Sequence, residues 1–159
     1  MERNFPANQG LYDRANEHDN CGIGFVADIK GRKSNDIVQR GLEVLERMEH
    51  RGAESADNKT GDGAGIMMQI PHTFFAAEVK NLPAEGEYGA GLVFLPNDAA
   101  QAAAVMKEFE RIAEGEGCSV LAWRDVPVND SCIGDIARRS EPMIKNVFVV
   151  SKEKRSAAA

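Results

Sequence analysis

The chain has 159 residues, a net charge of −6 and 43% hydrophobic residues. This composition is too apolar for general disorder and predicts a soluble globular protein with one domain. The negative charge argues against nucleic-acid binding, since phosphate contacts require a surplus of Lys and Arg. No run approaches the roughly 20 apolar residues of a membrane span, and no signal peptide is recognisable, so a cytoplasmic location without membrane contact is expected.

The order of polar and apolar stretches predicts strands interleaved with helices, an α+β or α/β layered domain. The clearest helix has Asp98 and Gln101 in the positions of a capping box. The elements expected in chain order are a polar leader 1–20, strand 21–28, turn 30–33, helix from Ser34 or Asn35 to near 49–52, loop 53–65, strand 66–70, helix 73–79, loop 81–87, strand 89–95, helix 98–114, strand 118–126, helix 133–139, strand 144–150 and a disordered tail 151–159.

The three cysteines, Cys21, Cys118 and Cys132, are an odd number and widely spaced. Neither a disulfide framework nor a structural zinc site is indicated by this spacing. His18 and Cys21 have His-x-x-Cys spacing, but a second pair of ligands is missing. We therefore expect no metal or cofactor site on this chain, and a redox or metal-binding role for the cysteines is disfavoured.

Cys21 lies where the polar leader gives way to an apolar run, with Gly22 and Gly24 beside it. A lone cysteine is most often a small buried hydrophobe. If the leader is removed before Cys21, however, the new α-amino group lies within reach of the thiol and can act as its base. Cys21 is therefore a candidate nucleophile.

Arg51 and Gly52 directly follow the first predicted helix. The guanidinium can simply bind the last helix carbonyls, or its planar donors can orient the backbone at Cys21 or a bound substrate. Both interpretations stay open on spacing alone.

The glycine-rich stretch at residues 61–65 does not fit a phosphate-binding loop. It has neither a Gly-x-Gly-x-x-Gly pattern nor a Walker-type Lys, and it precedes a predicted strand rather than a helix. Asp62 can face a pocket or lie in a tight turn. His50 and His72 are isolated and are interpreted as structural histidines with satisfied hydrogen bonds.

Several ordered motifs together resemble the amino-terminal region of the large chain of glutamate synthase, and the likeness covers about residues 11–150. The motifs that carry it are Glu17-His18-Asp19-Asn20-Cys21-Gly22-Ile23-Gly24-Phe25, Met48-Glu49-His50-Arg51-Gly52-Ala53, Thr60-Gly61-Asp62-Gly63-Ala64-Gly65-Ile66, Gln69-Ile70-Pro71-His72, Phe74-Phe75, Tyr88-Gly89-Ala90-Gly91-Leu92-Val93-Phe94-Leu95-Pro96, Glu141-Pro142 and Phe148.

This resemblance implies a class II glutamine amidotransferase domain, residues 21–150, with the four-layer αββα sandwich of N-terminal-nucleophile hydrolases. It implies that residues 1–20 are a propeptide. Cys21 would attack the amide of L-glutamine, release ammonia and form a γ-glutamyl thioester that water hydrolyses to glutamate. Arg51 and Gly52 would hold the nucleophile end and the pocket in place.

The resemblance also implies parts that this sequence does not contain. The family's carboxylate-binding Arg, its oxyanion-hole Asn-Gly pair and its FMN and iron–sulfur regions fall in later segments. We therefore expect a partial sandwich from a truncated chain, whose partners are the remaining synthase domains or a small subunit. An inactive fragment or a non-catalytic binding remnant of the domain is the alternative.

Overall fold

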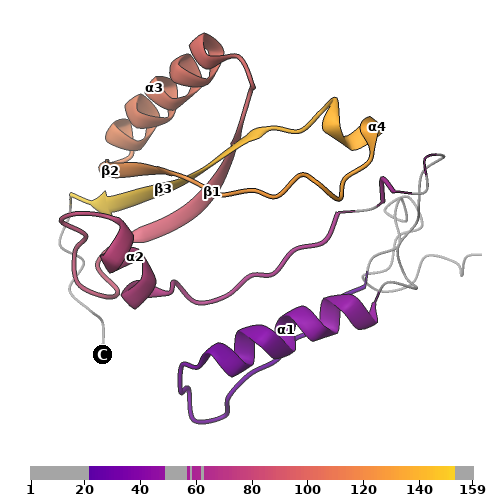
Figure 1. Ribbon diagram of the computed structural model, residues 1–159. Coiled ribbons are helices and arrows are strands. Elements are labelled where there is room, and N and C mark those ends of the chain that lie inside the picture. Colours follow the sequence, from indigo (N-terminus) through magenta and orange to yellow (C-terminus); the bar gives the residue numbers. More distant parts are fainter. Residues whose placement is uncertain (1–21, 49–56, 58, 62, 153–159) are drawn as a thin grey trace, which may run out of the picture. The chain divides into compact units, whose positions relative to one another are not determined.

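The computed structural model describes residues 22–48, 57, 59–61 and 63–152. The chain divides into two compact units, residues 1–67 and residues 68–159. In the described part, the first unit contains helix α1, and the second contains all three strands and helices α2 to α4 (Figure 1).

Helix α1 spans Asn35–Arg47, as its apolar periodicity predicts. Its N-cap is Ser34, whose side chain accepts a hydrogen bond from the Ile37 backbone N–H at 3.4 Å. On the outer face, Asp36 pairs with Arg40 at 2.9 Å, and Glu43 pairs with Arg47 in the same i,i+4 arrangement. Ion pairs of this kind support an exposed helix face only weakly, so the apolar face must supply the packing.

Two elongated segments lie against α1, one following residue 21 and the other leading to residue 67 (Figure 1). A Cβ atom at Gly24 would be 2.5 Å from Cγ1 of Val44, and a Cβ atom at Gly41 would be 2.7 Å from Cδ1 of Ile66. A larger residue at either position would therefore require a shift of the Val44 or Ile66 side chain or of the segment itself.

The strands expected at 21–28 and 66–70 are not formed among the described residues. The sequence there is rich in β-branched and aromatic residues, but a strand exists only when a neighbour satisfies its backbone groups. In the first of these segments, the side chains of Ile23 and Phe25 are open to solvent, 86% and 92% exposed. The prediction that these apolar segments form strands is therefore wrong for the residues that the structure describes.

The second unit is built on an antiparallel sheet of three strands in the order β1-β3-β2. The strands span Gly89–Leu95, Cys118–Asp125 and Met143–Ser151. The central strand β3 pairs with β1 along all seven β1 residues, while a register shift at Leu121 interrupts its pairing with β2.

One face of this sheet is covered at one end by helix α2, His72–Glu78. Phe148 of β3 is completely buried there, and its ring meets the Phe75 ring edge-on at a centroid distance of 4.9 Å. Val79 and Tyr88 complete the cluster of buried side chains. Aromatic burial of this kind supplies most of the packing energy of a small core.

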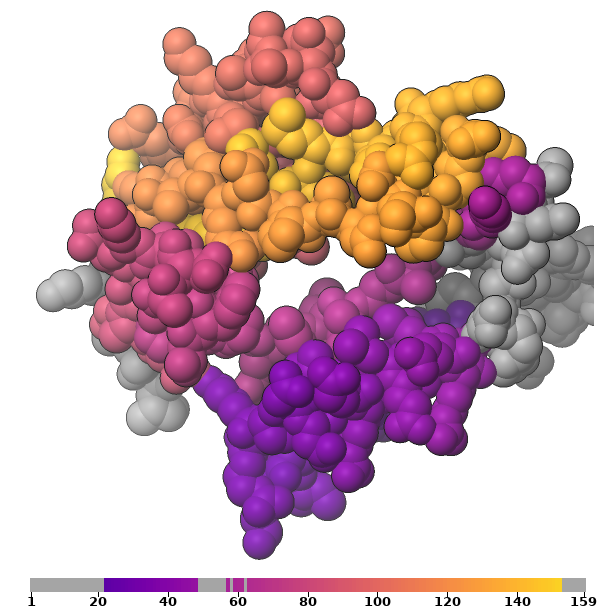
Figure 2. Space-filling view, viewed as in Figure 1, coloured from indigo at the N-terminus to yellow at the C-terminus, as the bar shows by residue number. Residues whose placement is uncertain are grey.

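The opposite face is covered by helix α3, Ala99–Gly115, whose side chains lie over the strands in the space-filling view (Figure 2). Phe109 of α3 packs edge-on against Trp123 of β2 at 5.4 Å. Trp123 also donates a hydrogen bond from Nε1 to Oε1 of Glu110 at 2.8 Å. The sheet of the second unit therefore lies between two helices.

Most element boundaries in this unit agree with the sequence prediction to within two residues. Asp98 caps α3 by accepting a hydrogen bond from the Gln101 N–H at 2.8 Å, which confirms the predicted cap. The short helix α4 spans Asp135–Arg138. Ser151, expected in the tail, is instead the last residue of β3, and residues 153–159 lie outside the described residues.

Candidate functional site

The three residues predicted to form the site, Cys21, Arg51 and Gly52, lie outside the described residues. Their predicted roles therefore stay predictions. The structure does describe what flanks them. The segment that begins at Gly22 lies along α1 through the Gly24–Val44 contact, and α1 ends at Arg47 with Met48 as its C-cap, three residues before Arg51.

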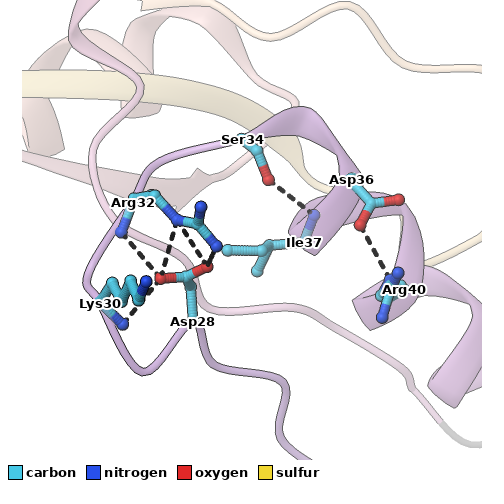
Figure 3. A network of polar contacts seen from close by, with 7 residues as sticks. All are labelled: Asp28, Lys30, Arg32, Ser34, Asp36, Ile37 and Arg40. Carbon is cyan, nitrogen blue, oxygen red and sulfur yellow. Dashed lines mark hydrogen bonds and ion pairs between the residues drawn. The ribbon is translucent and has the colours of Figure 1, made fainter.

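A turn organised by Asp28 connects the segment after Cys21 to α1 (Figure 3). The Asp28 carboxylate accepts hydrogen bonds from the backbone N–H groups of Lys30 at 2.8 Å and Arg32 at 3.2 Å. It also pairs with the Arg32 guanidinium, with Nη2 at 2.9 Å from Oδ2. Gly31 supplies the positive φ of 67° that the tight turn needs.

These contacts determine the electrostatics of the turn. The Arg32 guanidinium and the backbone donors hold the pKa of the Asp28 carboxyl below its ordinary value, because they stabilise the charged form. A hollow of about 520 Å³ opens beside the turn. Its acidic side chains Asp28 and Asp36 already pair with Arg32 and Arg40, so the hollow has the character of a solvated polar turn rather than of a substrate pocket.

The loop before the second elongated segment is held by Asp57. Its carboxylate accepts the Thr60 N–H at 2.8 Å and the Thr60 hydroxyl at 2.6 Å. Such an Asp-centred turn is a local structure, in which an acidic side chain accepts bonds from the residues that follow it. Asp62, the acidic residue that the sequence left open, lies outside the described residues.

His72 has the structural role that the sequence predicts. Its Nδ1 atom lies 3.2 Å from the hydroxyl of Tyr88, which is buried, and burial raises the pKa of that phenol. His50 lies outside the described residues.

Sequence reasoning missed the polar link between α2 and the sheet. Arg124 donates from Nη2 to Oε2 of Glu78 at 3.0 Å and from Nη1 to Oδ1 of the buried Asn146 at 3.3 Å. Its guanidinium also lies 5.2 Å from the Phe74 ring centroid. Alternation along β2 and β3 places Arg124 and Asn146 on one face, but only the tertiary structure brings Glu78 to them.

Two further observations concern the described part of the chain alone. It contains no group of three or more His, Cys, Asp or Glu side chains arranged to hold a metal ion. None of its helices combines the length and the apolar character needed to cross a bilayer.

Comparison with known families shows to which protein family the chain belongs. The family model of class-II glutamine amidotransferases matches residues 21–159. The chain belongs to this family. The match begins at Cys21, the residue that follows the polar leader.

Three relatives similar to this chain are named glutamate synthases. The chain is 44% identical over 146 residues to the glutamate synthase [NADPH] large chain of Bacillus subtilis. The aligned part covers 91% of this chain and 10% of that protein. The chain is 43% identical over 151 residues to the glutamate synthase [NADH] of Schizosaccharomyces pombe, with coverage of 92% and 7%. For the ferredoxin-dependent glutamate synthase 2 of Synechocystis sp., 39% identity extends over 141 residues, with coverage of 86% and 9%. The chain thus spans a tenth or less of the length of these relatives.

Proposed function

We propose that this chain carries the nucleophile end of a glutaminase site that releases ammonia from L-glutamine. The single observation that carries the proposal is that the family match begins at Cys21. A thiol at a new amino terminus has a base of its own, because an α-amino group with a pKa of about 7.7 to 8.0 is partly unprotonated at neutral pH.

In the proposed reaction the amine of Cys21 takes the proton from the thiol, and the sulfur attacks the amide carbon of the glutamine side chain. The tetrahedral intermediate collapses with loss of the amide nitrogen, which leaves as ammonia after accepting that proton. Water then attacks the γ-glutamyl thioester, which gives glutamate and regenerates the thiol. Residues 1–20 act as a propeptide, and Arg51 and Gly52 position the nucleophile end.

We further propose the four-layer αββα sandwich for the complete domain. In the first unit, α1 covers one side of the elongated segments, while Ile23 and Phe25 are exposed. In the second unit, α3 covers one face of the sheet, while Leu92 and Phe94 on the other face are 56% and 63% exposed. Apolar surfaces of this kind require a second covering layer, which supports a sandwich over a single-layer fold.

The ammonia would serve the synthase reaction in a longer protein or assembly, in the cytoplasm. FMN and the iron–sulfur cluster of such an enzyme are proposed to lie in its other domains or its small subunit, as the resemblance to the synthase large chain implies. The residues that grip the glutamine backbone and stabilise the oxyanion are proposed to lie in later segments as well. Since removal of one oxyanion donor can cost about 10²- to 10³-fold in rate, the 159 residues alone should release little ammonia.

The proposal is tested by intact mass and by labelling. The mature protein is expected to begin at Cys21, and a γ-electrophilic analogue of glutamine is expected to alkylate the Cys21 thiol. Cys21→Ser should abolish the label, whereas Cys132→Ser, which removes an exposed thiol, should leave it unchanged. A mature protein that still begins at Met1, or equal labelling in Cys21→Ser, would contradict the proposed nucleophile.

A further inference from the structure

We draw no further inference here: the strongest candidate, the exposed apolar patch that Leu92 and Phe94 form on strand β1, carries nothing beyond the sandwich already proposed, because nothing in the structure shows what covers it.

Discussion

The two units of this chain contain similar sequence patterns but differ in what holds them together. In the second unit, strand pairing and two covering helices bury Phe148 and Leu95 almost completely. In the first unit, none of the described residues is buried, and two apolar segments lie along α1 without strand pairing. Apolar periodicity is thus not enough for a core, because burial also requires elements on both sides of each layer.

The largest expected effect lies at the centre of the second unit. Phe148→Ala should lower the free energy of unfolding by about 3 to 5 kcal/mol, because it removes a buried ring and leaves a cavity. Phe94→Ala, at a position 63% exposed on the neighbouring strand, should cost far less. Denaturant titration followed by the fluorescence of Trp123, the single Trp of the chain, measures both variants. If Phe148→Ala and Phe94→Ala lower the free energy of unfolding equally, burial of the Phe148 ring is not the cause of its larger expected effect.

The helix caps permit a direct comparison of the two units. Asp98→Ala removes a 2.8 Å bond to the Gln101 N–H at the start of α3 and should cost about 1 kcal/mol. Ser34→Ala removes a 3.4 Å bond at the start of α1 and should cost less, about 0.5 kcal/mol. Thermal or denaturant unfolding followed by far-UV circular dichroism compares them. Asp98→Asn and Ser34→Asp retain a capping oxygen and should restore most of the loss; if they do not, the loss has another cause.

The smallest expected effect is electrostatic and lies in the first unit. The pKa of Asp28 is below its ordinary value of 3.8, mainly because of its hydrogen bonds to Arg32. A depressed pKa in the folded state stabilises the turn above pH 3.8, and this contribution is lost as the pH falls through the lowered folded-state pKa.

Carboxyl-carbon NMR titration should therefore give Asp28 a midpoint below 3.8. Arg32→Gln should move that midpoint upward. Arg111→Gln removes a similarly exposed guanidinium from its pair with Glu108 in the other unit, so it serves as the control and should leave the Asp28 midpoint unchanged. An Asp28 midpoint that does not respond to loss of Arg32 would remove the proposed cause of the shift.

Much of the second unit could be predicted from local sequence. The cap at Asp98 and the stripe of α3 follow from short-range pattern, and strands β1 and β3 follow from β-forming runs bounded by turn residues. The link from Arg124 to Glu78 could not be predicted in this way, because the two residues are 46 positions apart and no local rule relates them.

The candidate site divides similarly. Local sequence was enough to single out Cys21 as the candidate nucleophile, because the polar leader, Cys21 and the flanking glycines form a local motif; the family match begins at the same residue. Spacing alone could not decide the role of Arg51. An arginine that binds the last helix carbonyls and one that orients a substrate would both be expected at this position after the helix. The sequence predicts the turn at 30–33, which is a local feature. It does not predict that the Asp28 carboxylate organises this turn.

By itself, the sequence determined which segments are apolar, where the helices begin, which residue is the candidate nucleophile, and the family to which the chain belongs. The tertiary structure decided which apolar segments become strands and which faces are buried. It also placed positions 24 and 41 so close to α1 and to the second segment that a Cβ atom there would come within 3 Å of the side chains of Val44 and Ile66, respectively. The physical reason is that propensity and capping act over a few residues, whereas strand pairing and burial depend on partners distant in sequence.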